Sequence, residues 1–290
     1  MSGIIINISP PKCGTTSLYF ALVASDDVAQ STLKEPRFFA GESQGGDGDL
    51  PDAMRTGGNY ANGPDWHEAL FEGQPDVRYR IDFTTYYAIT PDTPALLQRH
   101  YDDVRAIMVL RDPVKRFVSQ YYQYRKMGIS LPPIAEVIAG KGPIADLMYR
   151  FSDYRATYDR YVEAFGKDAV LVLDFDDLKS DPAKISAACN AFLGTHDIDY
   201  APSERDKNVA GRPRFGAVQR LIFSDGVRRA LRSISPDLKM RLLRWRKKIV
   251  LANTKAEAYP ALSESEQQAL AERLSSQTEF YRSFFGPKAG

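Results

Sequence analysis

Apolar residues along the chain form short continuous runs that alternate with longer amphipathic stretches. Three runs cover residues 4–8, 104–110 and 169–174. Runs of this length are typical of strands buried on both faces of a parallel sheet. The pattern therefore predicts a strand at each run, and residues 78–83, in which polar and apolar residues alternate, predict a fourth strand.

The stretches between the runs carry apolar residues at helical spacing. Ser263 and Glu266 form the capping box expected where the last helix begins. Alternating strands and helices predict an α/β fold: a P-loop-like three-layer sandwich with a central, mostly parallel sheet flanked by helices. No linker compels a division, so we expect one domain over residues 1–290. Helices are predicted at residues 17–24, 65–71, 94–101, 114–124, 149–165, 182–193, 216–251 and 263–285.

Three segments have no clear helical or strand pattern. Residues 41–63 are rich in Gly, Asp, Asn and Ser, and predict a long loop of the kind that lines sites. Residues 128–142 predict an excursion with one helical turn on the substrate side. Residues 205–214 are polar and predict irregular structure.

The first predicted strand runs into a segment suited to binding phosphate. Prolines at 10 and 11 end the strand, because proline has no N–H for the ladder. Gly14 permits a tight turn, and the hydroxyl residues Thr15, Thr16 and Ser17 open a helix. Backbone amides and the helix dipole favour an anion here, and Lys12 adds a full positive charge. The alternative is an ordinary strand–turn–helix with a solvated lysine. The order differs from a Walker A loop, because Lys12 precedes the glycine.

A second candidate site follows the predicted strand at 104–110. Arg111 stands at the carboxyl end of this strand, where open α/β sheets bind ligands, and Pro113 suits a helix start. Ser119 lies about two turns further along that helix. Arginine and serine at this separation can hold one phosphate group. The alternative is that Arg111 caps a neighbouring element and that Ser119 is merely exposed.

Composition narrows the class of protein. The chain has 290 residues, 43% hydrophobic and 26% charged, with a net charge of +1, which is ordinary for a soluble protein and gives no global field for nucleic acid. Basic residues outnumber acidic ones between 205 and 248, and for most of them we favour a solvated helix surface. Two cysteines and three scattered histidines predict neither a disulfide framework nor a metal site. With no leader or apolar membrane span, we expect a cytoplasmic protein without a transmembrane segment.

The two candidate phosphate sites resemble those of one enzyme family. Residues 11–18 (Pro-Lys-Cys-Gly-Thr-Thr-Ser-Leu) resemble the 5′-phosphosulfate loop of sulfotransferases that use 3′-phosphoadenosine 5′-phosphosulfate (PAPS). Residues 111–121 closely resemble the 3′-phosphate motif of the same family. Residues 34–39 (Lys-Glu-Pro-Arg-Phe-Phe) are similar to the Lys-Glu-x-x-Phe-Phe segment of its heparan-sulfate-type branch. Residues 82–87 resemble that branch's acidic-x-Ser/Thr-Pro-x-Tyr segment, with Thr85 in place of the proline, and residues 207–214 resemble its late basic loop.

This resemblance implies a division of roles among the residues. Lys12 places charge on the bridging and 5′-phosphate oxygens, and Glu35 acts as the base that deprotonates the acceptor. Asp82 and His67 are the alternative bases, and the alternative role for Glu35 is a salt bridge with Lys34 or Arg37. The acceptor side would involve Lys34, Arg37, Asp82 and Tyr87. The cofactor would be held by Lys12, Cys13, Gly14, Thr15, Thr16, Ser17, Arg111, Ser119, Lys207 and Arg212.

The expected reaction is transfer of a sulfuryl group from PAPS to a carbohydrate, glycolipid or glycosylated small molecule, leaving 3′-phosphoadenosine 5′-phosphate. The acceptor group would be a hydroxyl in preference to an amine, and no metal is required. Two other classes stay open: a nucleotide-dependent phosphotransferase on a similar loop, with Asp174 as the nearest candidate for a magnesium ligand, and a catalytically silent nucleotide-binding protein. The oligomeric state does not follow from the sequence.

Overall fold

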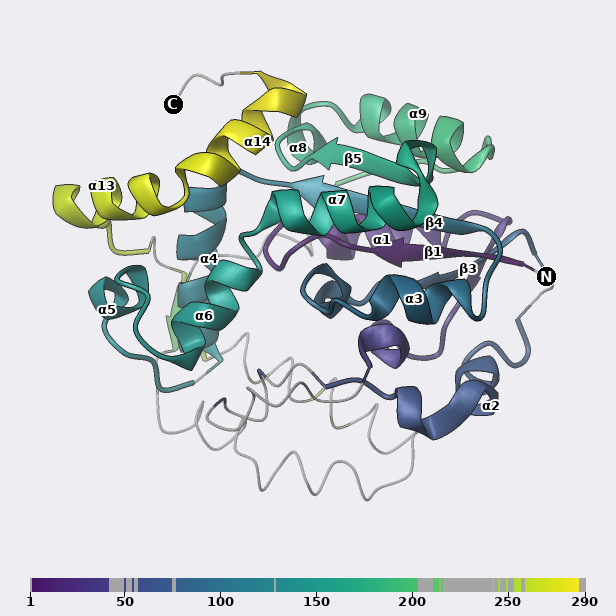
Figure 1. The fold of residues 1–290 in the computed structure, drawn as a ribbon, viewed down its shortest axis with the longest axis horizontal. Helices are drawn as coiled ribbons and strands as arrows, with labels where there is room; N and C mark the ends of the chain where they lie inside the picture. The colour runs from purple at the N-terminus through teal and green to yellow at the C-terminus, as the bar shows by residue number, and fades with distance from the viewer. Residues whose placement is uncertain are drawn as a thin grey trace.

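Five parallel strands form the centre of the molecule in the computed structural model (Figure 1). Their order is β2-β3-β1-β4-β5. The structure describes residues 2–41, 57–74, 77–127, 129–202 and 259–286, with shorter pieces at 50, 54, 211–213, 215, 242, 245, 249 and 253–256. The predicted fold class is confirmed. The strands of this sheet are β1 (Gly3–Asn7), β2 (Val28–Gln30), β3 (Tyr79–Asp82), β4 (Val104–Leu110) and β5 (Val170–Asp174).

Helices cover both faces of the sheet because its inner strands are apolar on both sides. Ile4 and Ile6 face one layer, formed by α3 (Thr93–Gln98), α7 (Tyr154–Phe165) and α14 (Ser275–Phe285). Ile5 faces the other layer, which contains α1 (Thr15–Leu22), α8 (Asp177–Ser180) and α9 (Pro182–Leu193). The alternation of side chains along β1 thus supplies two separate hydrophobic cores.

A third hydrophobic cluster lies beyond the carboxyl ends of the strands. It is built by α4 (Pro113–Lys126), α5 (Ile134–Ile138), α6 (Pro143–Arg150) and α13 (Glu264–Arg273). In Figure 1 the arrows of β1 and β5 point toward the side where these helices lie. Helix α4 therefore lies beside the loops that leave the sheet at the carboxyl ends of its strands.

The remaining elements are short. Helix α2 spans Gly63–Ala69, and 3₁₀ turns lie at Phe38–Ala40, Tyr60–Asn62, Thr85–Ala88 and Lys167–Ala169. Strands β6 (Gly211–Pro213) and β7 (Thr254–Ala256) pair antiparallel, and β6 packs against α4.

Several predicted boundaries were wrong. The helix expected at 149–165 is two helices, because Asp153 caps α7 by accepting from the Ala156 N–H. The helix expected at 263–285 divides at Leu274. Strand β2 was not predicted, since three residues are too few for a recognisable pattern, and the segment expected to be irregular contains β6. The single turn of α5 within 128–142 is confirmed, whereas most of the helix expected at 216–251 lies outside the described residues.

Candidate active site

The loop after β1 has the backbone of an anion cradle. Lys12 and Gly14 both adopt left-handed conformations, with φ of 76° and 77°. Between them, the Cys13 side chain is fully buried, which raises its pKa to about 12. Helix α1 begins at Thr15, and its N-cap residue, Gly14, has no side chain to bind the first-turn amides, which therefore face the loop. The predicted strand–loop–helix arrangement is thus present.

Side chains fix the loop to the sheet and to α1. Ser9 Oγ accepts a 2.7 Å hydrogen bond from the Val109 N–H of β4. Ser17 Oγ donates to the Gly14 carbonyl at 3.0 Å, and the Tyr200 hydroxyl donates to Ser17 at 3.3 Å. The Thr15 side chain is buried. The cradle is therefore held from both sides.

Lys12 lies close to two other basic residues: Arg111, which directly follows β4, and Lys126 of α4. Lys12 Nζ donates to Gln123 Oε1 at 3.4 Å. Burial, together with the nearby charges of Arg111 and Lys126, lowers the pKa of Lys12 to about 8. Two further cations near the Lys12 ammonium mark a place where negative charge is favoured.

Arg111 leaves the end of β4 and reaches the phosphate loop. Its Nη1 donates to the Lys12 carbonyl at 3.1 Å, and its guanidinium lies 4.5 Å from the centroid of the Phe175 ring. Lys179 Nζ lies 4.4 Å from the same ring. The two phosphate sites predicted from the sequence are therefore in contact. The alternative role of Arg111, capping a neighbouring element, also has support, because Arg111 donates a hydrogen bond to a loop carbonyl.

Ser119 faces the same region from α4. Its side chain is mostly buried, contrary to the exposed alternative. Burial raises the pKa of Tyr259, while a hydrogen bond with Ser119 and the charge of Arg111 lower it less strongly. The Tyr259 ring stacks on Tyr122 with centroids 4.6 Å apart. Ser119, Arg111 and Tyr259 therefore form one cluster beside the loop.

Glu35 follows β2 and lies near the phosphate loop through its neighbour Lys34. Lys34 Nζ donates to Thr16 Oγ1 at 2.8 Å and lies 3.9 Å from Glu35 Oε1. The Thr85 hydroxyl donates to Glu35 Oε2 at 3.3 Å. About a third of the Glu35 side chain is exposed, so the carboxylate is accessible as well as paired. The salt bridge considered as an alternative role is present and does not remove the residue from the site.

Two predicted substrate contacts lie in the protein core instead. The side chains of Asp82 and Tyr87 are both fully buried and hydrogen-bond to each other. Burial raises the pKa of Asp82 to about 7, although hydrogen bonds from Tyr87 and Thr84 act in the opposite direction. Because neither side chain reaches the surface, the structure does not support direct contact with an acceptor.

The other candidates have mixed placements. His67 is buried against Phe38, with ring centroids 4.5 Å apart, and burial lowers its pKa to about 3, which does not suit a base for an acceptor. Arg37 remains beside Glu35, with its guanidinium 3.7 Å from the centroid of the Tyr86 ring. Lys207 lies outside the described residues. The backbone of Arg212 lies in β6 against α4, and its side chain is also outside them.

Asp174, the candidate magnesium ligand of the phosphotransferase alternative, is buried. Its Oδ1 accepts hydrogen bonds from the Asp176 N–H at 3.0 Å and from the Tyr281 hydroxyl at 3.1 Å. In the part of the chain that the structure describes, no group of three or more His, Cys, Asp or Glu side chains could hold a metal ion.

Three residues near the site were not predicted from the sequence. Gln123 follows Ser119 by one helical turn, a spacing that could have indicated it. Phe175 directly follows β5, at the same sheet edge as Arg111. Tyr259 gave no local signal, because its neighbour Ser119 is far away in the sequence.

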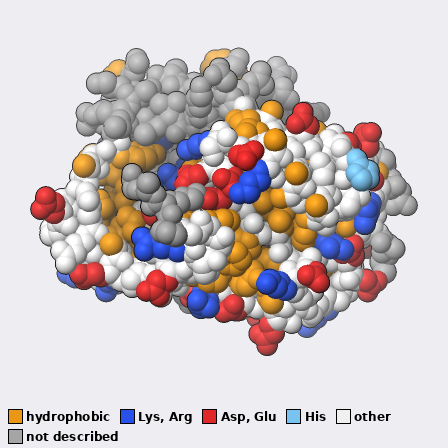
Figure 2. Space-filling view, turned by 90° about the horizontal axis from the view of Figure 1, so that it is seen from above, with side chains coloured by type: hydrophobic (Ala, Val, Ile, Leu, Met, Phe, Trp, Pro, Cys, Tyr) orange, Lys and Arg blue, Asp and Glu red, His pale blue; other side chains and the backbone are white. Residues whose placement is uncertain are grey.

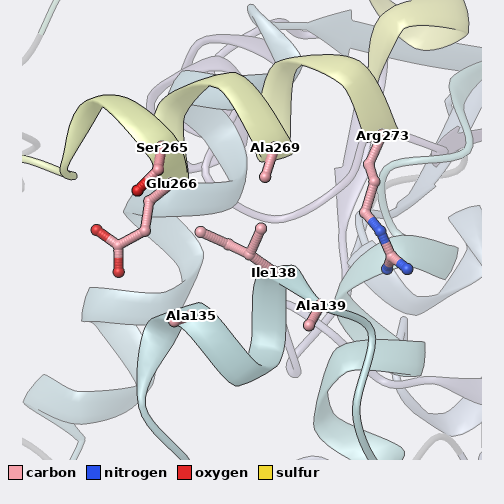
Figure 3. A pocket seen from close by; sticks show the side chains of 7 residues that line it. All are labelled: Ala135, Ile138, Ala139, Ser265, Glu266, Ala269 and Arg273. Carbon is pink, nitrogen blue, oxygen red and sulfur yellow. The ribbon is translucent and has the colours of Figure 1, made fainter.

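A hollow of about 180 Å³ lies between α5 and α13, outside the cluster just described (Figure 3). Its wall is mostly small and apolar, with Glu266 and Arg273 along α13 as its charged residues. Glu266 already belongs to the capping box of α13, so the hollow offers little chemistry. Figure 2 shows one face of the molecule, on which basic and acidic side chains are interspersed rather than gathered in a patch of one sign.

None of the helices among the described residues is long and apolar enough to cross a membrane. Comparison with a solved structure supports the fold. A sulfotransferase from Alicyclobacillus acidocaldarius superposes with a TM-score of 0.57 at 20% identity, covering 95% of this chain and 96% of that one. At this identity the similarity establishes the fold alone.

Sequence comparison finds similarity to sulfotransferases. Residues 91–209 match the family model described as a sulfotransferase domain. The chain is 25% identical over 230 residues to the mouse bifunctional heparan sulfate N-deacetylase/N-sulfotransferase 1, covering 73% of this chain and 24% of the mouse protein. It is 27% identical over 139 residues to human heparan sulfate glucosamine 3-O-sulfotransferase 6, covering 47% of this chain and 41% of that protein. The chain thus spans about a quarter of the first relative and less than half of the second. Residues 91–209 thus match a sulfotransferase domain, and over most of its length the chain is similar in sequence and fold to sulfotransferases.

Proposed function

We propose that the protein transfers a sulfuryl group from PAPS to a hydroxyl of a carbohydrate, glycolipid or glycosylated small molecule. The observation that carries this proposal is the position of Lys34. Its ammonium donates to Thr16 of the phosphate loop at 2.8 Å and lies 3.9 Å from Glu35. A candidate base is thereby placed next to the loop that would hold the donor, as a direct transfer requires.

The residues around the loop fit a nucleotide that carries phosphate groups at both the 5′ and the 3′ positions of its ribose. The uncapped amides of α1, Lys12 and the loop hydroxyls would hold the 5′-phosphate, and Arg111 with Ser119 would hold the 3′-phosphate. The Cys13 side chain is buried, so this residue would contribute its backbone. Lys207 and Arg212 would complete the site from the late basic loop. When bound, PAPS supplies the sulfuryl group and leaves as 3′-phosphoadenosine 5′-phosphate.

Protein groups then perform two tasks. Glu35 accepts the proton of the acceptor hydroxyl, and Lys12 places positive charge where the leaving group develops negative charge. Sulfuryl transfer resembles phosphoryl transfer, in which positioning and charge stabilisation dominate. With cations provided by the protein, the reaction needs no metal ion.

The acceptor class is inferred from the relatives. The two relatives named above are heparan sulfate sulfotransferases, one described as acting on nitrogen and one on a 3-oxygen. We favour a hydroxyl acceptor, with Lys34 and Arg37 on the acceptor side of Glu35. The cytoplasmic location expected from the sequence belongs to this proposal as well.

Glu35→Gln tests the role of the base. The variant keeps the shape of the side chain but cannot take up a proton, so kcat with radiolabelled PAPS should fall by about 10²- to 10⁴-fold. Calorimetric affinity for 3′-phosphoadenosine 5′-phosphate should stay within about twofold of the wild type.

Glu68→Gln is the matched control, because Glu68 pairs with Arg80 on the exposed surface of α2. It should retain the wild-type rate. If Glu35→Gln instead keeps its rate, or loses nucleotide binding, Glu35 has a structural role and the proposed mechanism is wrong.

A further inference from the structure

Asp82, at the end of β3, is a buried carboxylate whose hydrogen bonds all lead toward the candidate base. Its side chain is fully buried. Oδ1 accepts from the Thr84 hydroxyl at 2.7 Å and from the Thr84 N–H at 3.2 Å, and Oδ2 accepts from the Tyr87 hydroxyl. Burying a carboxylate is unfavourable unless hydrogen bonds compensate for its lost hydration. The groups that form these bonds therefore indicate the role of Asp82.

Both hydroxyl partners of Asp82 also accept a backbone N–H from the segment after Glu35. Thr84 Oγ1 accepts from the Arg37 N–H at 3.1 Å. The Tyr87 hydroxyl oxygen accepts from the Phe39 N–H at 3.1 Å. Because each hydroxyl donates its hydrogen atom to Asp82, each oxygen must turn a lone pair toward these amides. One carboxylate thus orients two hydroxyls that hold two positions of residues 37–39.

This segment needs such support, because Arg37 has a left-handed backbone with φ of 55°. That conformation is unfavourable for a residue with a side chain, because its β-carbon crowds the backbone. From the other side, Asn59 fixes the same turn: its N–H donates to the Arg37 carbonyl at 3.0 Å and its Nδ2 donates to the Pro36 carbonyl at 2.6 Å. The turn that carries Glu35 is therefore clamped between β3 and Asn59.

The turn after β3 that contains Thr84 also contacts the carboxylate of Glu35. Thr85, directly after Thr84, donates its hydroxyl to Glu35 Oε2 at 3.3 Å. Two consecutive threonines therefore act on one segment. Thr84 fixes its backbone at Arg37, and Thr85 fixes the side chain of Glu35.

We infer that Asp82 is a positioning residue for the catalytic base, acting through Thr84 and Tyr87 on the turn that carries Glu35. This inference rests on the proposed function, in which Glu35 takes the proton of the acceptor. Asp82 touches neither donor nor acceptor in this role. It sets the geometry from which Glu35 acts.

Thr84→Val and Thr84→Ser form the central test. Valine has nearly the same shape but loses both the bond to Asp82 and the bond from Arg37, whereas serine keeps the hydroxyl. Because small misplacements of catalytic groups are costly, Thr84→Val should lower kcat by about tenfold to a hundredfold, with KM for PAPS and affinity for 3′-phosphoadenosine 5′-phosphate within about twofold of the wild type. Thr84→Ser should recover most of the rate. If the Asp82→Asn variant folds, its kcat should fall as much as that of Thr84→Val.

Thr195→Val controls for a general loss of stability. Thr195 is also buried, and its hydroxyl donates to Asn190 Oδ1 at 2.8 Å in the turn after α9. This variant should lower Tm and keep the wild-type kcat. If Thr84→Val behaves in the same way, or if it weakens nucleotide binding as much as turnover, Asp82 has only a structural role and the inference is wrong.

A double variant separates this inference from the proposed function. When Glu35 is already Gln, adding Thr84→Val should lower the remaining rate by less than twofold, because the positioned group is gone. A further tenfold loss would show that Thr84 acts independently of Glu35 and would overturn the inference. If the wild-type protein transfers no sulfuryl group from PAPS to any hydroxylated acceptor, the proposed function itself fails, whatever the variants do.

Discussion

At the scale of single residues, Lys12 combines two properties that suit an anion-binding loop. Its left-handed backbone turns the loop, and its buried ammonium has a pKa lowered to about 8. At pH 7 the group is still mostly charged, and it loses its proton as the pH rises through 8. A bound phosphate would raise the pKa again, so binding and protonation are linked.

We therefore predict that affinity for 3′-phosphoadenosine 5′-phosphate falls with rising pH. Only the charged form of Lys12 attracts the 5′-phosphate, so a pKa of about 8 predicts roughly tenfold weaker binding at pH 9 than at pH 7. Calorimetry across this range measures the change. Lys12→Arg is the control, because a guanidinium stays charged and should give a nearly flat profile. A flat profile for the wild type would remove Lys12 from the phosphate site.

At the scale of elements, α1 begins differently from α4, α7 and α9. Aspartates cap these three helices by accepting a backbone N–H from the first turn. The N-cap of α1 is instead Gly14, which has no side chain and therefore leaves the first-turn amides facing the loop. A β-carbon on Gly14 would lie 2.8 Å from Leu178 Cδ1 and 3.3 Å from the Phe175 ring.

Gly14→Ala should consequently be more destabilising than a left-handed backbone alone explains. The conformation costs alanine roughly 1–2 kcal/mol, and crowding against Leu178 adds about 1–3 kcal/mol. Gly194 also has a left-handed backbone, but a β-carbon there would meet the guanidinium of Arg78, an exposed side chain that can shift at the cost of its hydrogen bond to the Gly194 carbonyl. Gly194→Ala should therefore be less destabilising than Gly14→Ala. Urea unfolding of both variants compares them. Equal losses would mean that the loop is not packed against α8 as described.

The elements also show why part of the fold followed from the sequence. Strands β1 and β4 were predicted because their residues are apolar in succession, as burial on both faces requires. Strand β2 was missed because three residues give no period. The division between α6 and α7 depends on Asp153, one polar residue within an otherwise helical stretch, and only the observed cap distinguishes it from a surface residue.

At the scale of the whole molecule, the site exists because parallel strands end at one edge. Loops after β1, β2, β3 and β4 bring together Lys12, Glu35, Thr85 and Arg111. This convergence was predictable for Lys12 and Arg111, since each follows a strong strand signal. The burial of Asp82 and the approach of Tyr259 to Ser119 depend on packing between distant segments, which no local pattern reports.

The central claim is that the two phosphate sites belong to one nucleotide with a 3′-phosphate. Calorimetry without magnesium, comparing 3′-phosphoadenosine 5′-phosphate with ADP, tests it most directly. We predict that the 3′-phosphorylated nucleotide binds at least about a hundredfold more tightly, and that Arg111→Ala removes most of this preference because it deletes a charged bidentate contact. Arg105→Ala, which removes a β4 guanidinium paired with Asp103, should preserve it. If ADP binds equally well, or binds only with magnesium, the PAPS assignment is contradicted and a phosphotransferase becomes the better account.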